Sequence, residues 1–410
     1  MKKTVLLLSL LAPAVLSCKK DDSAPAPETT VPEAVCVNSE DIAHLLSSLN
    51  IGPEQVREVH DAVRASSDNG YDEEYTMKDL FDTPGAGVGD ARLKSTGLYD
   101  ARTKSAGGYA RPLRDLIEEY LCGTKAGNNV LNGMTAEKYI SLLSGSDRQI
   151  YWPYSETWDG KTMPVITFDP LTGEDVNTGW YMDGDGVLRE IEVNEEMASE
   201  RPVWVVNSND DAGYETLQML RKSEEGGDIS IKGGSSPAEF AHGIVKAPSS
   251  EDFKTLRLKS FTMLRNYDNW FAGASEFFLK IGSVKYFRTI TDSNMYDYTP
   301  YITDFMIVVK RKYLGKALDL NTVLVSEWTS DIESCGFMIT EYDGGTQTSW
   351  KCNAVVKYNS KSYGVEIDLP LNSRDDIVWR GQLGRRFIEK NADVAGSFGD
   401  VRVVMSLTDQ

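Results

Sequence analysis

The feature that most constrains this fold is a run of short apolar stretches in residues 249–410, each bounded by turn-forming residues. The stretches are rich in β-branched and aromatic side chains, and turn signals recur about every dozen residues. The predicted strands are 253–264, 276–281, 304–309, 322–328, 335–341, 350–358, 363–369, 377–379 and 401–407. Because no helical pattern separates them, we predict an antiparallel β-sandwich for residues 249–410.

Residues 38–148 have a different pattern, in which apolar side chains recur at spacings of three and four. Ser39 and Thr135 are suited to cap helices, and Pro53 suits a first helical position. The predicted helices are 40–49, 53–63, 75–81, 113–121 and 136–143. This spacing predicts a helical N-terminal domain over residues 38–148.

Residues 149–248 mix short strand-like stretches with one helical stretch. Asp183-Gly184-Asp185-Gly186 is a strong turn signal between two of the strands. The predicted elements are strands at 164–168, 179–182, 187–193, 203–206 and 229–231, and a helix at 214–221. The chain is therefore predicted to be a multidomain α+β protein: a helical N-terminal domain, a small α+β module and a C-terminal antiparallel β-sandwich.

The N-terminus has the pattern of an export signal. Lys2 and Lys3 precede an apolar run over residues 4–16, which is shorter than the ~20 residues that a membrane span needs. The sequence Val15-Leu16-Ser17-Cys18 then resembles the lipobox of bacterial lipoproteins, although Leu16 stands where a smaller residue is more usual. The resemblance implies that residues 1–17 are a signal peptide and that Cys18 receives lipid. The alternative is an ordinary cleaved signal in which Cys18 is incidental.

Residues 18–37 are predicted to be the lipidated Cys followed by a flexible tether. Residues 23–33 are rich in Pro, Ala and Thr, which favours an extended linker. Residues 19–22, Lys-Lys-Asp-Asp, are similar to the signal that sends some lipoproteins to the outer surface. This similarity implies an outer-membrane protein at the cell surface, whose membrane partner is reached through the lipid anchor. The alternative is a solvated tether whose charges carry no address.

The net charge of the chain limits the classes of molecule that it is expected to bind. Acidic residues number 62 against 43 basic ones, which gives a formal net charge of −19. A chain this acidic repels phosphate backbones, so no nucleic-acid partner is expected. The simplest role of this charge is solubility.

The cysteines other than Cys18 form an even set, Cys36, Cys122, Cys335 and Cys352. In an exported chain an even set favours disulfides. If Asp343-Gly344 is a two-residue hairpin turn, Cys335 and Cys352 lie opposite each other at a non-hydrogen-bonded pair, close enough for a bond.

The same hairpin register places Phe337 opposite Trp350. If Cys335 and Cys352 pair, Cys36 and Cys122 are left to pair with each other. The alternative is that Cys335 and Cys352 are free thiols.

A dense aromatic group, Tyr151, Trp152, Tyr154 and Trp158, precedes Gly160 and is the predicted ligand-binding site. Exposed aromatic faces bind sugar rings and protein hot spots. The alternative is that these rings fill the seam between the helical domain and the α+β module. A second group, Tyr267, Trp270 and Phe271, has the same two interpretations.

No metal or cofactor is predicted. The chain has no CxxC pair and only three histidines, His44, His60 and His242, so a zinc site is poorly supported. Residues 183–194 fail the EF-hand pattern, because Val187 stands where an oxygen ligand is needed and Asn194 stands where a Glu is needed. A calcium site at loops of the sandwich would follow no spacing rule that the sequence could test.

Catalytic motifs are also absent from the sequence, which has no G-x-S-x-G, H-E-x-x-H or Walker loop. We therefore expect a non-catalytic binding or structural protein that contacts glycan or protein. The alternative is an extracellular hydrolase of glycan or peptide, since a pair of catalytic carboxylates has no local motif. A third possibility is a helper subunit of a surface complex.

Overall fold

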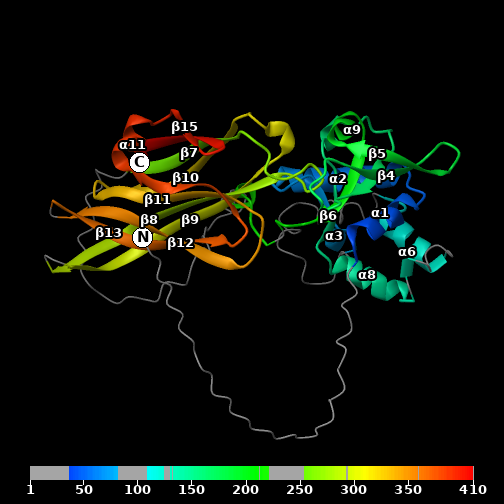
Figure 1. The fold of residues 1–410 in the computed structure, drawn as a ribbon, viewed down its shortest axis with the longest axis horizontal. Helices are drawn as coiled ribbons and strands as arrows, with labels where there is room; N and C mark the ends of the chain where they lie inside the picture. The colour runs from blue at the N-terminus through cyan, green and yellow to red at the C-terminus, as the bar shows by residue number, and fades with distance from the viewer. Residues whose placement is uncertain are drawn as a thin grey trace, which may run out of the picture. The chain divides into compact units, whose positions relative to one another are not determined.

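The computed structural model describes residues 37–81, 109–123, 130–131, 133–211, 213–220, 254–291, 294–358 and 360–409 (Figure 1). The predicted signal peptide, Cys18, nearly all of the tether and the predicted strand at 229–231 lie outside these residues. Within the described part, no helix is both long and apolar enough to cross a bilayer.

The N-terminal helices form where the apolar spacing predicted them. They are α1 (Ser39–Ser47), α2 (Pro53–Asp68), α3 (Met77–Phe81), α6 (Leu113–Gly123) and α8 (Ala136–Ser144). Thr135 caps α8 as expected, with its side chain accepting from the Lys138 N–H. The cap of α1 is Asn38 rather than Ser39, because the Asn38 side chain accepts from the Asp41 N–H at 2.7 Å.

These helices pack on a six-stranded mixed sheet. Its strands are β1 (Glu74–Thr76), β2 (Arg148–Tyr151), β3 (Val165–Phe168), β4 (Val176–Met182), β5 (Leu188–Asn194) and β6 (Val203–Ser208), and α9 (Glu195–Glu200) follows β5. The spatial order is β1-β2-β6-β3-β4-β5, and β3 and β6 are the parallel pair. Ile42 of α1, Ile166 of β3 and Trp204 of β6 belong to one buried cluster. The boundary predicted after residue 148 therefore does not separate two cores.

The C-terminal half consists of antiparallel sheets, as predicted, and part of it curls into a half-barrel. Its elements are β7 (Lys254–Met263), β8 (Ser275–Thr291), β9 (Asn294–Val309), η2 (Arg311–Tyr313), β10 (Leu318–Trp328), β11 (Ile332–Glu341), β12 (Gln347–Tyr358), β13 (Lys361–Asn372), β14 (Asp376–Gly384), α11 (Arg385–Lys390), β15 (Ala395–Phe398) and β16 (Val401–Asp409). One sheet has the order β10-β7-β16-β15 and the other β13-β12-β11-β8-β9, with β14 also on β11. Helix α11 and strand β15 were not predicted.

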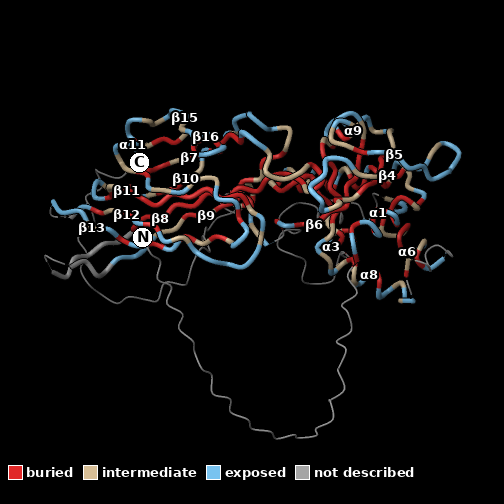
Figure 2. The backbone as a smooth tube through the Cα atoms, viewed as in Figure 1, coloured by how far each residue is buried: buried red, intermediate tan, exposed pale blue. Residues whose placement is uncertain are grey.

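The core of this half lies between the two sheets. Phe261 of β7, Trp328 of β10 and Phe337 of β11 are fully buried in one cluster. A second, smaller cluster lies on the opposite face of β11, where Met338 packs with Cys352 and neighbouring side chains of β12 and β13. Figure 2 shows buried segments concentrated along the strands of all the sheets. Strand β11 is thus buried on both faces.

The predicted hairpin register around Asp343-Gly344 is wrong. Cys335 lies opposite Leu383 of β14, and Cys352 lies opposite Ile367 of β13. The contact between β11 and β12 is limited to the start of β11, at Ile332 and Ser334. The physical reason is that β11 is a central strand whose two edges are taken by β8 and β14 along most of its length.

This strand topology places the side chains of Cys335 and Cys352 in two separate clusters. Cys335 points into the core between the sheets, whereas Cys352 belongs to the cluster on the other face of β11. Among the residues that the structure describes, Cys122, Cys335 and Cys352 are free thiols. Phe337 lies opposite Ile281 and Gly381 instead of Trp350. Cys36, the predicted partner of Cys122, lies outside the described residues.

Candidate functional site

The aromatic group predicted to bind ligand is mostly inside the protein. Trp152 is 1% exposed and Tyr151 is 2% exposed, while Tyr154 and Trp158 are half-buried. The Trp152 ring lies 5.6 Å from the ring of Trp158 and 6.0 Å from that of Trp204, measured between centroids. Tyr151 and Trp152 therefore present no ring face to solvent, which favours the packing interpretation of this segment.

Two cations of η2, Arg311 and Lys312, form ion pairs with acids that lie in or contact the aromatic segment 151–158. The Arg311 guanidinium donates to both oxygens of Glu195, at 2.6 and 3.0 Å, and the Tyr154 hydroxyl donates to Glu195 at 2.9 Å. Although burial opposes it, this pairing with Arg311 lowers the pKa of Glu195. Arg311 also donates to the backbone oxygen of Asp268 at 2.9 Å. A bidentate contact of this kind fixes geometry as well as charge.

The second cation, Lys312, lies between two acids. Its ammonium is 3.0 Å from Glu73 and 2.7 Å from Glu156. Burial raises the pKa of Glu73 to about 7, against the attraction of Lys310 and Lys312. The backbone oxygen of Glu73 accepts from the Trp152 N–H at 2.8 Å. The aromatic segment is therefore held by a network of paired charges and has the properties of a structural element.

The β4–β5 hairpin is the contrasting surface. Its turn forms as predicted: the Asp183 carboxylate accepts from the Asp185 and Val187 N–H groups and from Arg189, and Gly186 has a φ of 75°. These contacts lower the pKa of Asp183. Because this carboxylate serves the turn, the structure gives no reason to assign it to a calcium ion.

Exposed apolar side chains lie at both ends of this hairpin, since Met182 pairs with Leu188 beside the turn and Val176 pairs with Asn194 at the other end. The loop residue Leu171 is 75% exposed, and the other exposed apolar residues here are Val176, Met182, Val187 and Leu188. β5 is the last strand of its sheet, so its outer edge pairs with no other described strand. The hairpin thus combines an open strand edge with apolar exposure.

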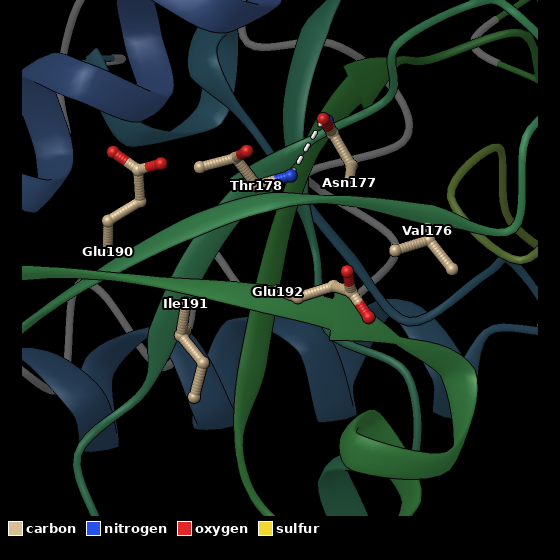
Figure 3. Close-up of a pocket in the computed structure, with 6 residues that line it drawn as sticks. All are labelled: Val176, Asn177, Thr178, Glu190, Ile191 and Glu192. Atoms are coloured by element: carbon tan, nitrogen blue, oxygen red, sulfur yellow. Dashed lines mark hydrogen bonds between the residues drawn. The ribbon is translucent and has the colours of Figure 1, made fainter.

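A hollow of about 470 Å³ lies across the two strands (Figure 3). It is lined by Val176, Asn177, Thr178, Glu190, Ile191 and Glu192. Glu190 and Glu192 are exposed and lie two positions apart, so both project from the same face of β5. Figure 3 shows Glu190 and Thr178 on one side of the strands and Ile191 on the other. The surface therefore offers carboxylates beside apolar side chains, and sequence reasoning missed it because exposure has no local pattern.

The structure places two of the three histidines, His44 and His60, and His242 lies outside the described residues. His44 packs against Trp180, with 4.0 Å between ring centroids, and His60 packs 5.2 Å from Trp158. Both therefore have packing roles. Among the described residues, one group of carboxylates, Asp268, Glu276 and Glu341, is arranged as a metal site could be.

No protein-family model, curated protein or solved structure matches this chain. The function is therefore argued from its own residues.

Proposed function

We propose that this protein is a surface-exposed lipoprotein with a non-catalytic binding role, anchored through Cys18. Its C-terminal β-sandwich supports the mixed sheet, whose β4–β5 hairpin contacts a protein partner. The observation that carries the proposal is the exposed apolar and acidic surface at the open edge of β5. Contiguous exposed apolar patches mark interaction sites on soluble proteins.

The open edge favours an extended partner. An edge strand presents unpaired N–H and C=O groups, which a second strand can satisfy by extending the sheet. The Asp183 N–H donates to the Val187 oxygen at 2.9 Å, which makes this pair the hydrogen-bonded one beside the turn. By the alternation of antiparallel pairs, the N–H groups of Glu190 and Glu192 then point away from β4, toward the open edge.

The charge of the edge favours basic side chains on the partner. Glu190 and Glu192 project from one face, and no described ion pair involves either of them, whereas Arg189 is paired with Asp183 at 2.7 Å. A partner strand with basic residues at every second position would place its cations beside these two carboxylates. Protein is favoured over glycan because Tyr151 and Trp152, the rings best suited to stack on sugars, are buried.

The alternative function, hydrolysis of an extracellular polymer, has less support. The carboxylate oxygens of Asp268, Glu276 and Glu341 lie within 4.8 Å of one another, and Glu276 and Glu341 are buried. Glycosidases hold their two carboxyl groups about 5–9.5 Å apart across an open cleft. Glu276 and Glu341 are instead buried, which does not fit two carboxyl groups that face a sugar across an open cleft.

The binding surface is tested with fluorescent peptides of alternating Lys and Val, and with matched peptides of alternating Glu and Val. Anisotropy should report saturable binding of the Lys-Val peptide alone. Glu190→Gln should weaken binding and reduce its salt dependence. Glu190→Pro should abolish binding, since it also removes an outward N–H. Equal binding of both peptides, or unchanged binding by Glu190→Pro, would contradict the proposal.

The anchor is tested separately. Cys18→Ala should release the protein into the soluble fraction or leave the precursor unprocessed, because the thiol is the expected site of lipid attachment. Metabolic labelling with palmitate should mark the wild type and not the variant. Equal labelling of both would show that Cys18 is incidental.

A further inference from the structure

Three carboxylates converge where β8, β11 and the loop after β7 meet. Glu276 lies near the start of β8, Glu341 ends β11, and Asp268 lies in the loop between β7 and β8. One oxygen from each residue lies within 4.8 Å of the other two. The two strands are adjacent. Glu341 lies opposite Phe277, and the Tyr342 N–H donates to the backbone oxygen of Glu276 at 2.9 Å. The register pairs Glu341 with Phe277, not with Glu276, so the convergence arises at the ends of these strands together with the loop that carries Asp268.

Two of these carboxylates are buried, and some oxygens of the group accept no hydrogen bond from an N–H or O–H donor. Glu341 is 1% exposed and Glu276 is 3% exposed. Among the described residues, no N–H or O–H group donates to the buried atoms Glu341 Oε1 and Asp268 Oδ2, and the two side chains lie within hydrogen-bond reach of each other. A buried carboxylate oxygen that lacks a partner destabilises the fold, and buried charges are normally paired or bound to metal. An acceptor-only oxygen facing other acceptors requires a proton or a cation.

The surroundings are acidic as well. Burial raises the pKa of Glu276, and the acids Asp210, Asp268 and Asp72 raise it further. Burial and the charge of Asp268 also raise the pKa of Glu341. The nearest cation of η2, Arg311, reaches the backbone oxygen of Asp268, while its charge is satisfied by Glu195. Acids therefore outnumber cations around this group, and its oxygens can be satisfied only by a bound proton or a bound cation.

We propose that Asp268, Glu276 and Glu341 bind a divalent cation of the calcium type. Ligands made only of oxygen favour hard cations such as Ca²⁺ and Mg²⁺. Because one oxygen from each residue lies within 4.8 Å of the other two, small side-chain movements would bring all three to about 2.4 Å from one Ca²⁺ ion. Mg²⁺ binds at about 2.1 Å and needs a tighter octahedron, which makes Ca²⁺ the better fit.

The ion would fix the loop that carries Asp268. The same loop inserts Trp270 and Phe271 into a buried cluster with Tyr151 of the mixed sheet. Trp270 Nε1 donates to the backbone oxygen of Asp175 at 2.8 Å, and the Ala274 N–H donates to the Asp72 carboxylate at 3.0 Å. Binding at Asp268 would therefore stabilise the contacts between the antiparallel sheets and the mixed sheet.

The test begins with the full chain stripped of metal by EDTA. Adding Ca²⁺ should raise its melting temperature by several degrees, because an ion that binds the folded state alone stabilises it by mass action. Mg²⁺ at the same concentration should raise it less. Tb³⁺, a luminescent substitute for Ca²⁺, should give saturable emission excited through nearby tyrosine such as Tyr342, and Ca²⁺ should displace it.

Variants separate this site from the acidic surface. Glu341→Gln should weaken Tb³⁺ and Ca²⁺ binding by about tenfold or more, since even outer-shell changes at metal sites cost 10–100-fold. The metal-free variant should melt above the metal-free wild type, because one buried acid is removed. Asp268→Asn, in a half-buried loop, provides a second variant that should fold without difficulty and lose the same response.

A matched control is Asp304→Asn, which removes a half-buried acid that is paired with Lys280 at 3.3 Å. This variant should melt lower with or without metal and keep the full increment from Ca²⁺. An unchanged melting temperature of the wild type in millimolar Ca²⁺ would overturn the proposal. So would an equal response of the wild type and Glu341→Gln, which would indicate binding to surface acids only.

Discussion

The aromatic segment 151–158 and the β4–β5 hairpin belong to the same sheet and differ in almost every physical respect. In the segment Tyr151 and Trp152 are buried, and the acids Glu195 and Glu73 that contact it are paired with Arg311 and Lys312. The hairpin holds smaller apolar side chains that are exposed, beside acids that face solvent. The comparison teaches that residue type indicates what a side chain could bind, whereas packing decides whether a partner can reach it.

The largest expected effect is in the core of the aromatic segment. Trp152→Ala should lower the free energy of unfolding by about 3–5 kcal/mol, because a fully buried Trp leaves a cavity and loses its packing. Urea denaturation followed by circular dichroism measures the change. Trp158→Ala, at a half-buried ring, is the control and should cost less. A loss below about 1 kcal/mol for Trp152→Ala would mean that its ring is not part of the core.

The next largest loss of stability is expected at the partly buried arginine–carboxylate pair, which we compare with an exposed pair. Arg311→Ala should cost about 2–3 kcal/mol, below the 3–5 typical of a buried pair because Glu195 is partly exposed. Arg189→Ala breaks the exposed pair with Asp183 and should cost at most about 1 kcal/mol. Both are measured by the same urea titration. Equal costs would show that the network around Arg311 contributes no more than a surface ion pair.

The third effect is a pH dependence carried by Glu73. Its pKa is raised from 4.5 to about 7 by burial, so the folded state binds a proton more tightly than the unfolded state. The stability that this proton contributes is complete below pH 4.5 and is lost as the pH rises through about 7. Between pH 5 and pH 7 the loss should be about 2 kcal/mol, given 1.36 kcal/mol per pKa unit.

Glu73→Gln should remove that part of the slope, which unfolding measured at several pH values would detect. Glu156→Gln is the matched control, because Glu156 shares Lys312 but is exposed, and although burial opposes it, Lys312 lowers its pKa. A slope unchanged in Glu73→Gln would assign the pH dependence to other buried acids.

The smallest effect is expected on the hairpin. Leu188→Ala should change the free energy of unfolding by less than about 0.5 kcal/mol, as exposed substitutions usually do. The same variant should weaken binding of the Lys-Val peptide, because the apolar side chain is available only to a partner. A stability loss comparable with that of Trp152→Ala would show that Leu188 packs within the protein.

Much of the local structure could be predicted from the sequence. The nine predicted C-terminal strands match β7 to β14 and β16, and the helices begin at or next to their predicted first residues, except α3, whose first predicted residues form β1. The Asp183–Gly186 turn also forms as expected, because the Asp183 side chain accepts from nearby N–H groups and Gly186 adopts a positive φ, both within a few residues. Apolar periodicity and turn chemistry act within one or two turns of chain, which is why they can be detected in a single sequence.

The sequence by itself determined these elements and their order, and through the resemblance at Cys18 it predicts where the protein works. Only the tertiary structure decided which strands flank β11, and this choice separated Cys335 from Cys352. The burial of Trp152 and the convergence of Asp268, Glu276 and Glu341 were decided in the same way. The physical reason is that strand pairing and burial join residues far apart in the chain, and their spacing in the sequence carries no record of that contact.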